Sequence, residues 1–338
     1  MRGEKLVLLV TGLCARRCYY CPLSREKRGR DVVYANERPV RGDEDVIAEA
    51  VEMDARGTGL TGGDPLLRPQ RTVHFIRLLK ESFGPSHHIH LYTTTGGHVT
   101  RDVIRRLAEA GLDEIRFHPD LEAPSFNLEA LRWASDEGVT VGVEVPAIPG
   151  MEGALRRLLV EAERAGASFA NINELEMNDE NWFQLRMRGF RLREGSLSGV
   201  EGSEELALRL LEWAEGELSL NVHYCPASVK DAYQYRNRLR RKASKLAKPY
   251  EEVTGDGLLR KGVVEASTLG ELEALKRRLH EMGVGEGMAS IDPSRLVLET
   301  TVGALRAAKR RGLLGGLRAY IVEEYPTYDR RVAYKRPL

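Results

Sequence analysis

Short apolar strands and amphipathic helices alternate along the sequence from about residue 45 to residue 225, and this alternation constrains the fold more than any other feature. Helical segments between strands require the strands to pair in parallel through right-handed crossovers. We therefore predict an α/β fold built on a partial parallel (β/α) barrel, which places its chemistry at the carboxyl ends of its strands. Beyond a first strand at 5–11, we expect helices at 72–82, 101–110, 128–136 and 152–165 and strands at 89–93, 114–118, 140–145, 168–175 and 218–224.

A different pattern begins near Pro249. Thr268 and Glu271 form a possible capping box for a helix that ends near Met282. Strands on either side of this helix and of a second one suggest a β-α-β-β-α-β order, the ferredoxin-like arrangement. We therefore predict three parts, which are a barrel over 1–225, a basic helical linker over 226–250 and a smaller α/β C-terminal domain over 251–338.

The overall charge favours no class of partner, because 51 Lys and Arg residues face 50 Asp and Glu residues. The 30% charged content, with arginine ahead of lysine, is typical of proteins from hot environments. No stretch approaches the roughly 20 apolar residues that a membrane span needs, and the N-terminus shows no secretory pattern. We therefore expect a cytoplasmic protein with no membrane partner.

Three of the four cysteines lie within eight positions, directly after the first predicted strand. Cys14, Cys18 and Cys21 have the spacing C-x3-C-x2-C, which suits a loop around an iron-sulfur cubane better than disulfides. Three thiolate ligands leave one iron open to a reactant. The alternatives are a zinc site with Cys225 as fourth ligand or a closed electron-transfer cluster, although structural zinc sites usually show two close ligand pairs.

A second motif, Thr61-Gly62-Gly63-Asp64-Pro65-Leu66-Leu67, ends the next strand. Glycines let a backbone approach a ligand closely, and the Asp64 carboxylate can pair with an ammonium group. Alone, the motif would be a plain glycine-rich turn. Next to the cysteine loop, it indicates a ligand pocket.

In the segments TGLCARRCYYCPLS and TGGDPLL the chain resembles the radical S-adenosylmethionine superfamily, in particular archaeal proteins related to pyruvate formate-lyase activating enzymes. The family signature has the same cysteine spacing and an aromatic residue before the third cysteine, which is Tyr20 here. The resemblance implies a barrel of radical SAM type and a [4Fe-4S] cluster on the three cysteines. It further implies that S-adenosylmethionine binds the open iron and is cleaved reductively to a 5′-deoxyadenosyl radical, which takes a hydrogen atom from a substrate.

The resemblance also implies a pocket for the cofactor. Backbone carbonyls of Gly62, Gly63 and the following acid would accept hydrogen bonds from the methionyl ammonium. The family commonly has glutamate in the third position, so Asp64 shortens the reach by one methylene. The electron would come from an external one-electron reductant such as ferredoxin or flavodoxin.

Further cofactor-binding candidates lie at the ends of later strands. Thr94 offers a hydroxyl for a ribose or carboxylate, unless it belongs to an exposed turn. Arg116 and His118 alternate with apolar neighbours and can face the barrel lumen, where Arg116 would meet the cofactor carboxylate or pair with Glu144. Asn173 lies in a strand unusually polar for a parallel sheet, which indicates a partner such as ribose or adenine.

Residues 230–248 carry eight basic residues against one acid, at a spacing that predicts an amphipathic cationic helix. The helix is either a solvated surface or a phosphate-tracking one that would bind RNA. Cys225 is a small buried side chain, a hydrogen-atom donor, or a ligand to a second metal together with His223. The candidate RNA contacts are Arg236, Arg238, Arg240, Arg241 and Lys242.

These features leave two enzyme hypotheses and one non-catalytic one. The basic helix favours radical chemistry on an RNA nucleoside, whereas the family resemblance favours a glycyl-radical activase-like role or a peptide or small-metabolite substrate. The third hypothesis is an iron-sulfur or zinc module that binds nucleic acid without catalysis. The Gly-Gly-Asp motif argues against it, because a binding module needs no ammonium pocket beside a cluster.

Overall fold

The computed structural model describes residues 2–338, apart from the side chains of residues 230–232. It divides into two compact units, each described here by itself. The first comprises residues 3–51 and 55–234, and the second comprises residues 52–54 and 235–338. The division after residue 234 falls inside the segment predicted to be a linker.

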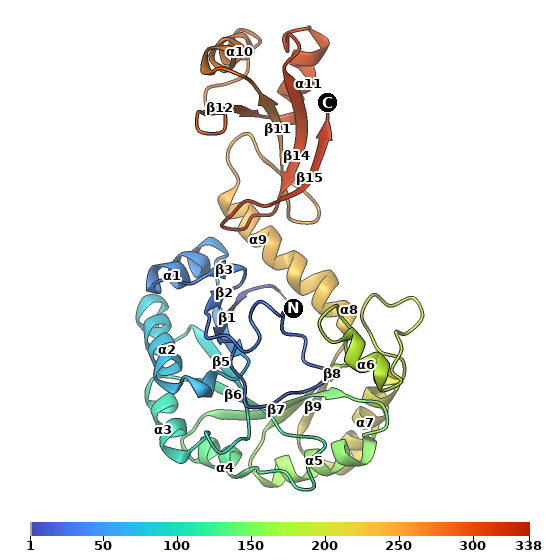
Figure 1. Cartoon of the computed structure of the whole chain (residues 1–338). Coiled ribbons are helices and arrows are strands. Elements are labelled where there is room, and N and C mark those ends of the chain that lie inside the picture. Colours follow the sequence, from blue (N-terminus) through green and yellow to red (C-terminus); the bar gives the residue numbers. More distant parts are fainter. Residues whose placement is uncertain (1) are drawn as a thin grey trace. The chain divides into compact units, whose positions relative to one another are not determined.

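A nine-stranded sheet forms the first unit, in the order β3-β2-β1-β4-β5-β6-β7-β8-β9. All neighbours from β1 to β9 pair in parallel, and only the short β2 and β3 are antiparallel. The predicted α/β class and partial parallel barrel are confirmed (Figure 1). The strands are β1 (Lys5–Thr11), β2 (Tyr34–Ala35), β3 (Arg38–Pro39), β4 (Gly57–Gly62), β5 (His88–Thr94), β6 (Glu114–His118), β7 (Thr140–Ala147), β8 (Phe169–Glu174) and β9 (Asn221–Cys225).

Helices cover the outside of this sheet (Figure 1). They turn apolar residues inward, as in α3, where Ile104 and Leu107 are buried and the Thr100 side chain caps the first turn by accepting from Val103 N. Between β8 and β9 the chain also forms a short helix and a long one that the sequence pattern did not predict. The helices are α1 (Asp43–Glu52), α2 (Pro69–Phe83), α3 (Arg101–Glu109), α4 (Glu129–Asp136), α5 (Glu152–Arg164), α6 (Trp182–Met187), α7 (Ser203–Glu217) and α8 (Ala227–Val229), with a 3₁₀ turn η1 (Pro65–Leu67) and a π-helical segment η2 (Lys230–Tyr235).

The strands of the barrel separate apolar from polar side chains by the two-residue period of a pleated sheet. In β6, Ile115 and Phe117 are fully buried, whereas Arg116 and His118 between and after them are only partly buried. The neighbouring strand β7 repeats the pattern, with Val143 buried and Glu144 partly exposed. The polar set of these strands therefore lies on one face of the sheet and the apolar set packs under the helices.

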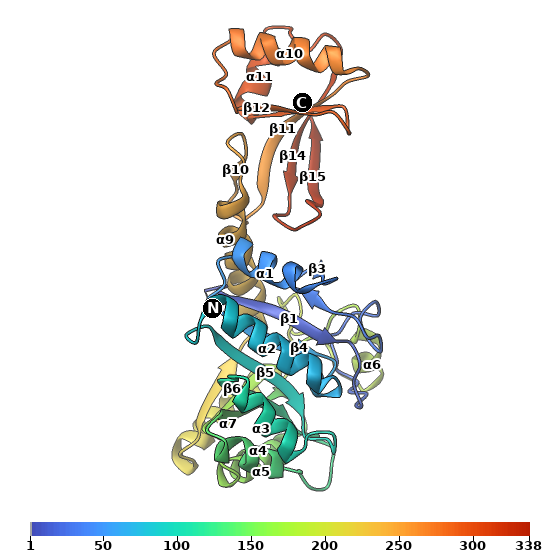
Figure 2. The ribbon, with the colours of Figure 1, turned by 90° about the vertical axis from the view of Figure 1, so that its left-hand side faces the viewer.

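The second unit has an antiparallel sheet in the order β12-β13-β11-β14-β15, with β10 paired to β11. The first four strands of this order have the ferredoxin-like topology predicted from the sequence, and both bonds of the Thr268–Glu271 capping box are present. Both α10 and α11 pack one apolar core against the sheet (Figure 2). The elements are α9 (Arg236–Leu246), β10 (Glu252–Val253), β11 (Leu259–Glu265), α10 (Leu269–Glu281), β12 (Ala289–Asp292), β13 (Val297–Thr300), α11 (Val302–Arg310), β14 (Arg318–Glu324) and β15 (Val332–Pro337).

A buried charge network lies on the sheet of the second unit. Lys261 Nζ is 2.8 Å from Glu299 Oε1 and 2.8 Å from Glu324 Oε2. The Tyr250 hydroxyl donates to Glu299 Oε2 at 2.6 Å. Burial raises the pKa of Glu299, but the hydrogen bonds from Lys261 and Tyr250 outweigh it and lower the pKa to about 2. The carboxylate is thus stabilised in its charged form.

Glu299→Gln is expected to destabilise the second unit by about 1–3 kcal/mol at neutral pH, because it removes a charged acceptor from buried donors. Because the pKa of Glu299 is depressed, its contribution is present above the ordinary value of 4.5 and is lost as the pH falls towards about 2. The Tm difference between wild type and variant should therefore narrow between pH 7 and pH 3. Exposed Glu273 on α10 gives the control Glu273→Gln, and a Tm difference independent of pH would contradict the assignment.

No helix of residues 2–338 is both long enough and apolar enough to cross a membrane.

Candidate active site

The cysteine loop follows β1 and carries three free thiols. Cys14 is exposed, and Cys18 and Cys21 are partly buried. Burial raises the pKa of Cys14, and the neighbouring charges of Asp64, Cys18 and Cys21 raise it further, so the three sulfurs lie within electrostatic reach of one another. A metal would have to displace these protons to bind the thiolates.

The donor set fits an iron-sulfur cluster better than a single ion. Among the side chains that the structure describes, no three of His, Cys, Asp or Glu are placed to hold one metal ion. In a cubane each thiolate ligates a different iron, so the three sulfurs are spaced more widely than the ligands of one ion. Cys14, Cys18 and Cys21 on one short loop suit that arrangement.

The Gly-Gly-Asp motif at the end of β4 holds the start of the cysteine loop. Gly63 N donates to Thr11 O at 2.8 Å, and Asp64 N donates to Leu13 O at 2.7 Å. A Cβ atom at Gly62 would lie 2.2 Å from Thr11 O, and one at Gly63 would lie 2.2 Å from Leu13 O. Only glycine permits this contact, so the two motifs singled out in the sequence form one structure.

The Asp64 carboxylate is fully buried and accepts from this chain's own donors. Oδ1 accepts from Leu66 N at 3.1 Å and from Thr93 Oγ1 at 2.8 Å. Oδ2 accepts from Thr94 N at 3.2 Å and Thr94 Oγ1 at 2.7 Å, and lies 2.9 Å from His98 Nε2. Five donors fill the roughly four lone-pair positions of a carboxylate. In the structure this side chain therefore fastens the β4 end to the β5 end, and a contact of Asp64 with the cofactor ammonium group remains a prediction.

The network also involves His98, which the sequence analysis did not single out. Burial raises the pKa of Asp64, but hydrogen bonds from His98 and Thr94 outweigh it and lower the pKa. The same hydrogen bond raises the pKa of His98. Thr94, expected to contact a ribose or carboxylate, is nearly buried and uses its hydroxyl on Asp64. A histidine four residues beyond Thr94 was the only sequence signal of this arrangement.

Tyr20 links the cysteine loop to the barrel. Its hydroxyl lies 2.9 Å from His118 Nε2, and His118 Nδ1 lies 2.8 Å from the backbone oxygen of Glu144. A carbonyl oxygen only accepts, so Nδ1 carries the proton and Nε2 accepts from the Tyr20 hydroxyl. Burial lowers the pKa of His118, which agrees with this neutral form. Tyr20 and His118, two candidates from the sequence, thus lie in direct contact.

The other polar candidates form a network on the polar face of the barrel. Arg116 donates to Glu144 Oε2 at 2.9 Å and also pairs with Glu114. Asn173 Nδ2 donates to Glu144 Oε1 at 2.9 Å, and Asn171 Nδ2 donates to Glu144 Oε2 at 3.0 Å. Of the two interpretations of Arg116, the structure shows the pairing with Glu144. Cofactor contacts by Arg116, Glu144 and Asn173 remain predictions.

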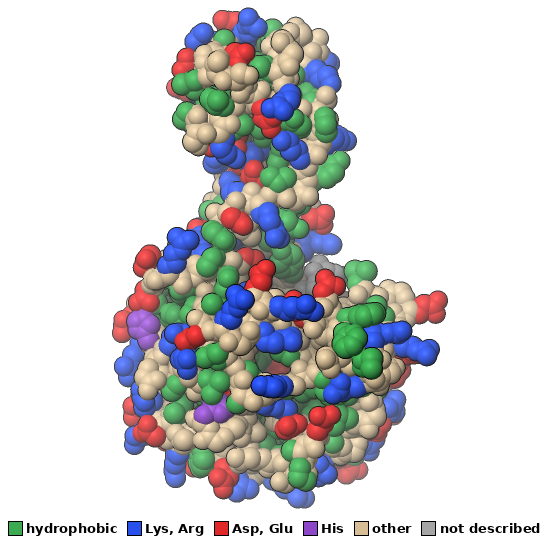
Figure 3. Space-filling view, in the orientation of Figure 1, with side chains coloured by type: hydrophobic (Ala, Val, Ile, Leu, Met, Phe, Trp, Pro, Cys, Tyr) green, Lys and Arg blue, Asp and Glu red, His purple; other side chains and the backbone are tan. Residues whose placement is uncertain are grey.

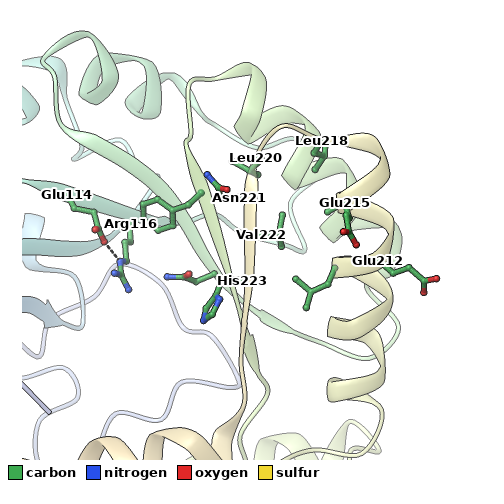
Figure 4. A pocket seen from close by; sticks show the side chains of 13 residues that line it. Glu114, Arg116, Glu212, Glu215, Leu218, Leu220, Asn221, Val222 and His223 are labelled. Carbon is green, nitrogen blue, oxygen red and sulfur yellow. Dashed lines mark hydrogen bonds and ion pairs between the residues drawn. The ribbon is translucent and has the colours of Figure 1, made fainter. Parts of the chain in front are cut away.

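Cavities of the first unit lie at both ends of its strands. A cavity of about 300 Å³ adjoins the cysteine loop and is lined by Arg16, Cys18, Tyr20, Asp120 and Ile148, among others. A cavity of about 810 Å³ lies where β6, β8 and β9 begin, where Arg116 and Glu114 are joined and His223 comes from β9 (Figure 4). Catalytic groups of parallel barrels lie at the carboxyl ends of the strands, so the smaller cavity belongs to the candidate site.

Cys225 ends β9 opposite Asn173 and is partly buried. His223 belongs to the same strand but lines the larger cavity at its beginning. No metal-binding group of three described side chains includes this pair. Hydrogen-atom donation by Cys225 remains a prediction.

Much of the cationic row predicted for RNA is used within the second unit. Lys242 is nearly buried and lies 3.1 Å from Glu52, and Arg241 lies 2.6 Å from Asp54. Arg240 donates to the backbone oxygen of Gly255. Arg236 lies 3.4 Å from Asp256, and the Arg238 guanidinium stacks 5.1 Å from the Tyr235 ring centroid. The predicted helix is therefore present, but its charges are engaged by nearby groups.

Comparison with known proteins gives three results. Residues 8–158 match the family described as the Radical SAM superfamily. A Methanocaldococcus jannaschii protein, provisionally named a glycyl-radical enzyme activating enzyme, is 40% identical over 348 residues, which cover 100% of this chain and 91% of the relative.

Among solved structures, Streptococcus suis SuiB bound to S-adenosylmethionine matches with a TM-score of 0.50 at 12% identity, over 68% of this chain and 52% of SuiB. SuiB bound to its precursor peptide SuiA also gives 0.50, with 50% of that chain covered. This chain thus spans about half of SuiB. At this identity the likeness concerns the fold.

Proposed function

Because this chain belongs to the radical S-adenosylmethionine superfamily, we propose that it activates a partner protein by taking a hydrogen atom from one of that protein's glycine residues. The observation that carries the proposal is the 40% identity over the whole chain to a relative provisionally named for this activity. A non-catalytic binding module is excluded, since the family consists of enzymes.

The cofactors of this enzyme are a [4Fe-4S] cluster and S-adenosylmethionine. Cys14, Cys18 and Cys21 would hold the cluster, which supplies one electron to break the sulfonium bond of S-adenosylmethionine. An external one-electron reductant must restore that electron.

In this proposal the residues around the cysteines hold the cysteine loop in position. The amides of Gly63 and Asp64 fix the backbone of Thr11 and Leu13, from which the loop to Cys14 begins. The close approach at Gly62 and Gly63 leaves no side chain between the β4 end and this loop, so their carbonyls would be free to meet an ammonium group. Tyr20 is held by His118 on one side, and Asn181 Nδ2 donates to its backbone oxygen at 3.0 Å. Rigid support of this kind fixes the ligands before the cofactor binds.

Isotope transfer tests the proposal. The protein is reconstituted anaerobically with iron and sulfide, and S-adenosylmethionine and dithionite are added. Protein and RNA fractions are prepared from cells of the source organism grown on C2-deuterated glycine. We expect 5′-deoxyadenosine to form and to gain deuterium only with the protein fraction. Cleavage without deuterium transfer from any protein would contradict the glycine substrate while keeping the enzyme class.

An RNA nucleoside remains the alternative substrate, on the strength of the cationic helix α9. Its support is limited, because Arg240, Arg241 and Lys242 already contact carbonyl or carboxylate groups of the second unit. An RNA-dependent increase in 5′-deoxyadenosine, without deuterium from protein, would favour this alternative. If the substrate were a peptide or a small metabolite, neither fraction would increase 5′-deoxyadenosine formation unless it contained that compound.

A further inference from the structure

An unusual group of exposed apolar side chains lies in the segment between β8 and β9. Phe183 is 62% exposed, Met187 is 70% exposed and Leu197 is 93% exposed. Trp182 and Leu192 in the same segment are also exposed. We call Trp182, Phe183, Arg186 and Met187 the α6 patch. Hydrophobic side chains gather beside Lys and Arg side chains over α6 in the space-filling view (Figure 3).

Helical geometry explains why these side chains share one face. Residues four apart on a helix are neighbours, so Trp182 lies beside Arg186 and Phe183 beside Met187. Leu185 is fully buried and anchors the opposite side of α6. Exposed aromatic and methionine side chains are costly in water and are enriched at the centres of protein interfaces. The α6 patch therefore has the composition of a docking surface.

Polar contacts tie the α6 segment directly to the cysteine loop. Asn181, which precedes α6, donates through Nδ2 to the Tyr20 backbone oxygen at 3.0 Å. Asn178 Nδ2 donates to Pro22 O at 3.4 Å. The Arg188 guanidinium lies 4.2 Å from the Tyr19 ring centroid. The segment that contains the α6 patch is thus in contact with the residues next to Cys18 and Cys21.

The border of the patch is cationic. Arg186, Arg188 and Arg191 are exposed on α6 and directly after it. Residues 178–191 contain two acids, of which Asp179 is exposed and Glu180 lies 3.6 Å from Arg25 on the cysteine loop, so the three arginines outnumber the exposed acid. An apolar centre with arginines around it is complementary to a partner with apolar contacts and a carboxylate border.

We propose that the α6 patch docks an acidic one-electron carrier protein, which reduces the cluster held by Cys14, Cys18 and Cys21. One electron passes from the reduced carrier to the oxidised cluster, and no bond or proton changes place. Electron transfer slows steeply with distance, so a carrier is best docked on the cysteine loop itself, whereas a substrate must enter the barrel. The inference rests on the proposed function through its reductive cleavage of S-adenosylmethionine, which requires this electron whichever substrate is used.

Phe183→Glu and Arg186→Glu test the docking. The probe is a purified acidic flavodoxin kept reduced by its reductase, with a ferredoxin as second probe. Each variant should bind the carrier about tenfold more weakly in an anaerobic titration, as expected for a central or charged interface residue. 5′-Deoxyadenosine formation driven by the carrier should fall similarly, while formation driven by dithionite should stay unchanged. Arg186→Glu should also reduce the salt dependence of binding.

Two matched control variants distinguish a loss of carrier docking from a loss of folding or of cofactor cleavage. Phe183→Leu keeps an apolar side chain and should retain binding. Leu269→Glu makes the same kind of change at a side chain of the second unit that is 41% exposed, and should leave both rates unchanged.

Four outcomes would overturn the inference. They are unchanged carrier binding in Phe183→Glu, an equal loss of the dithionite-driven rate, no binding of either carrier by the wild type, or a variant that keeps carrier-driven cleavage but loses deuterium transfer from protein. The last would assign the patch to the protein substrate. Absence of dithionite-driven cleavage in the wild type would instead contradict the proposed function. The binding titration with the carrier would still test whether the α6 patch is the docking surface.

Discussion

Replacement of Cys18 by serine is expected to remove the iron-sulfur cluster and to abolish cleavage of S-adenosylmethionine. The loop supplies three thiols, and each must ligate its own iron for the fourth iron to stay open. Serine keeps the shape of the side chain, but its hydroxyl does not ionise near neutral pH and is a poor ligand for iron. The loss should exceed the roughly 10- to 100-fold effect of removing an outer-shell partner of a metal ligand.

Iron content, visible absorbance and 5′-deoxyadenosine formation of the reconstituted variant would measure this effect. Cys225→Ser is the matched control, since Cys225 lies at the end of β9 and not on the cysteine loop. It should retain both iron and cleavage. Loss of iron in Cys225→Ser would show that four cysteines hold the metal and would remove the open position on which the proposed chemistry depends.

The residues that were predictable from sequence are those whose signal is local. The cysteine spacing, the glycine pair and the capping box at Thr268 are each contained in eight or fewer consecutive residues. The alternation of strand and helix was also predictable, because each element shows its own periodicity. These signals gave the barrel, the ferredoxin-like order and the loop that carries Cys14, Cys18 and Cys21.

The features that were not predictable depend on contacts between distant segments. No local pattern around Asp64 indicates that the β5 end brings Thr93, Thr94 and His98 against its carboxylate. The sequence of α9 likewise does not show that the fold places residues 52–54 and 255–256 beside its charged side chains. The segment around α6 is too short and irregular to show a period. The sequence shows how far apart two residues lie along the chain. The partners of these side chains depend instead on which distant segments the fold brings together.

Asp64→Ala is the second change with a large expected effect. It leaves the donors of Thr93, Thr94 and His98 without their buried acceptor, which is expected to destabilise the first unit by about 3–5 kcal/mol. The side chain of Asp64 fastens the β4 end to β5, and the backbone of that β4 end holds Leu13 at the start of the cysteine loop. Cofactor cleavage should therefore fall by about 10- to 100-fold in the protein that remains folded. Thermal unfolding and 5′-deoxyadenosine formation would measure the two effects.

Asp64→Asn separates the charge from the shape and has a defined pH dependence. The depressed pKa of Asp64 means that its contribution is lost as the pH falls below the ordinary value of 3.8. The raised pKa of His98 means that its contribution is complete below the ordinary value of 6.5 and is lost as the pH rises through the folded value. The Tm difference between wild type and Asp64→Asn should therefore be largest between these two pH values and smaller on both sides. A difference that does not vary with pH would show that the Asp64–His98 pair is not charged in the folded protein and would contradict this assignment.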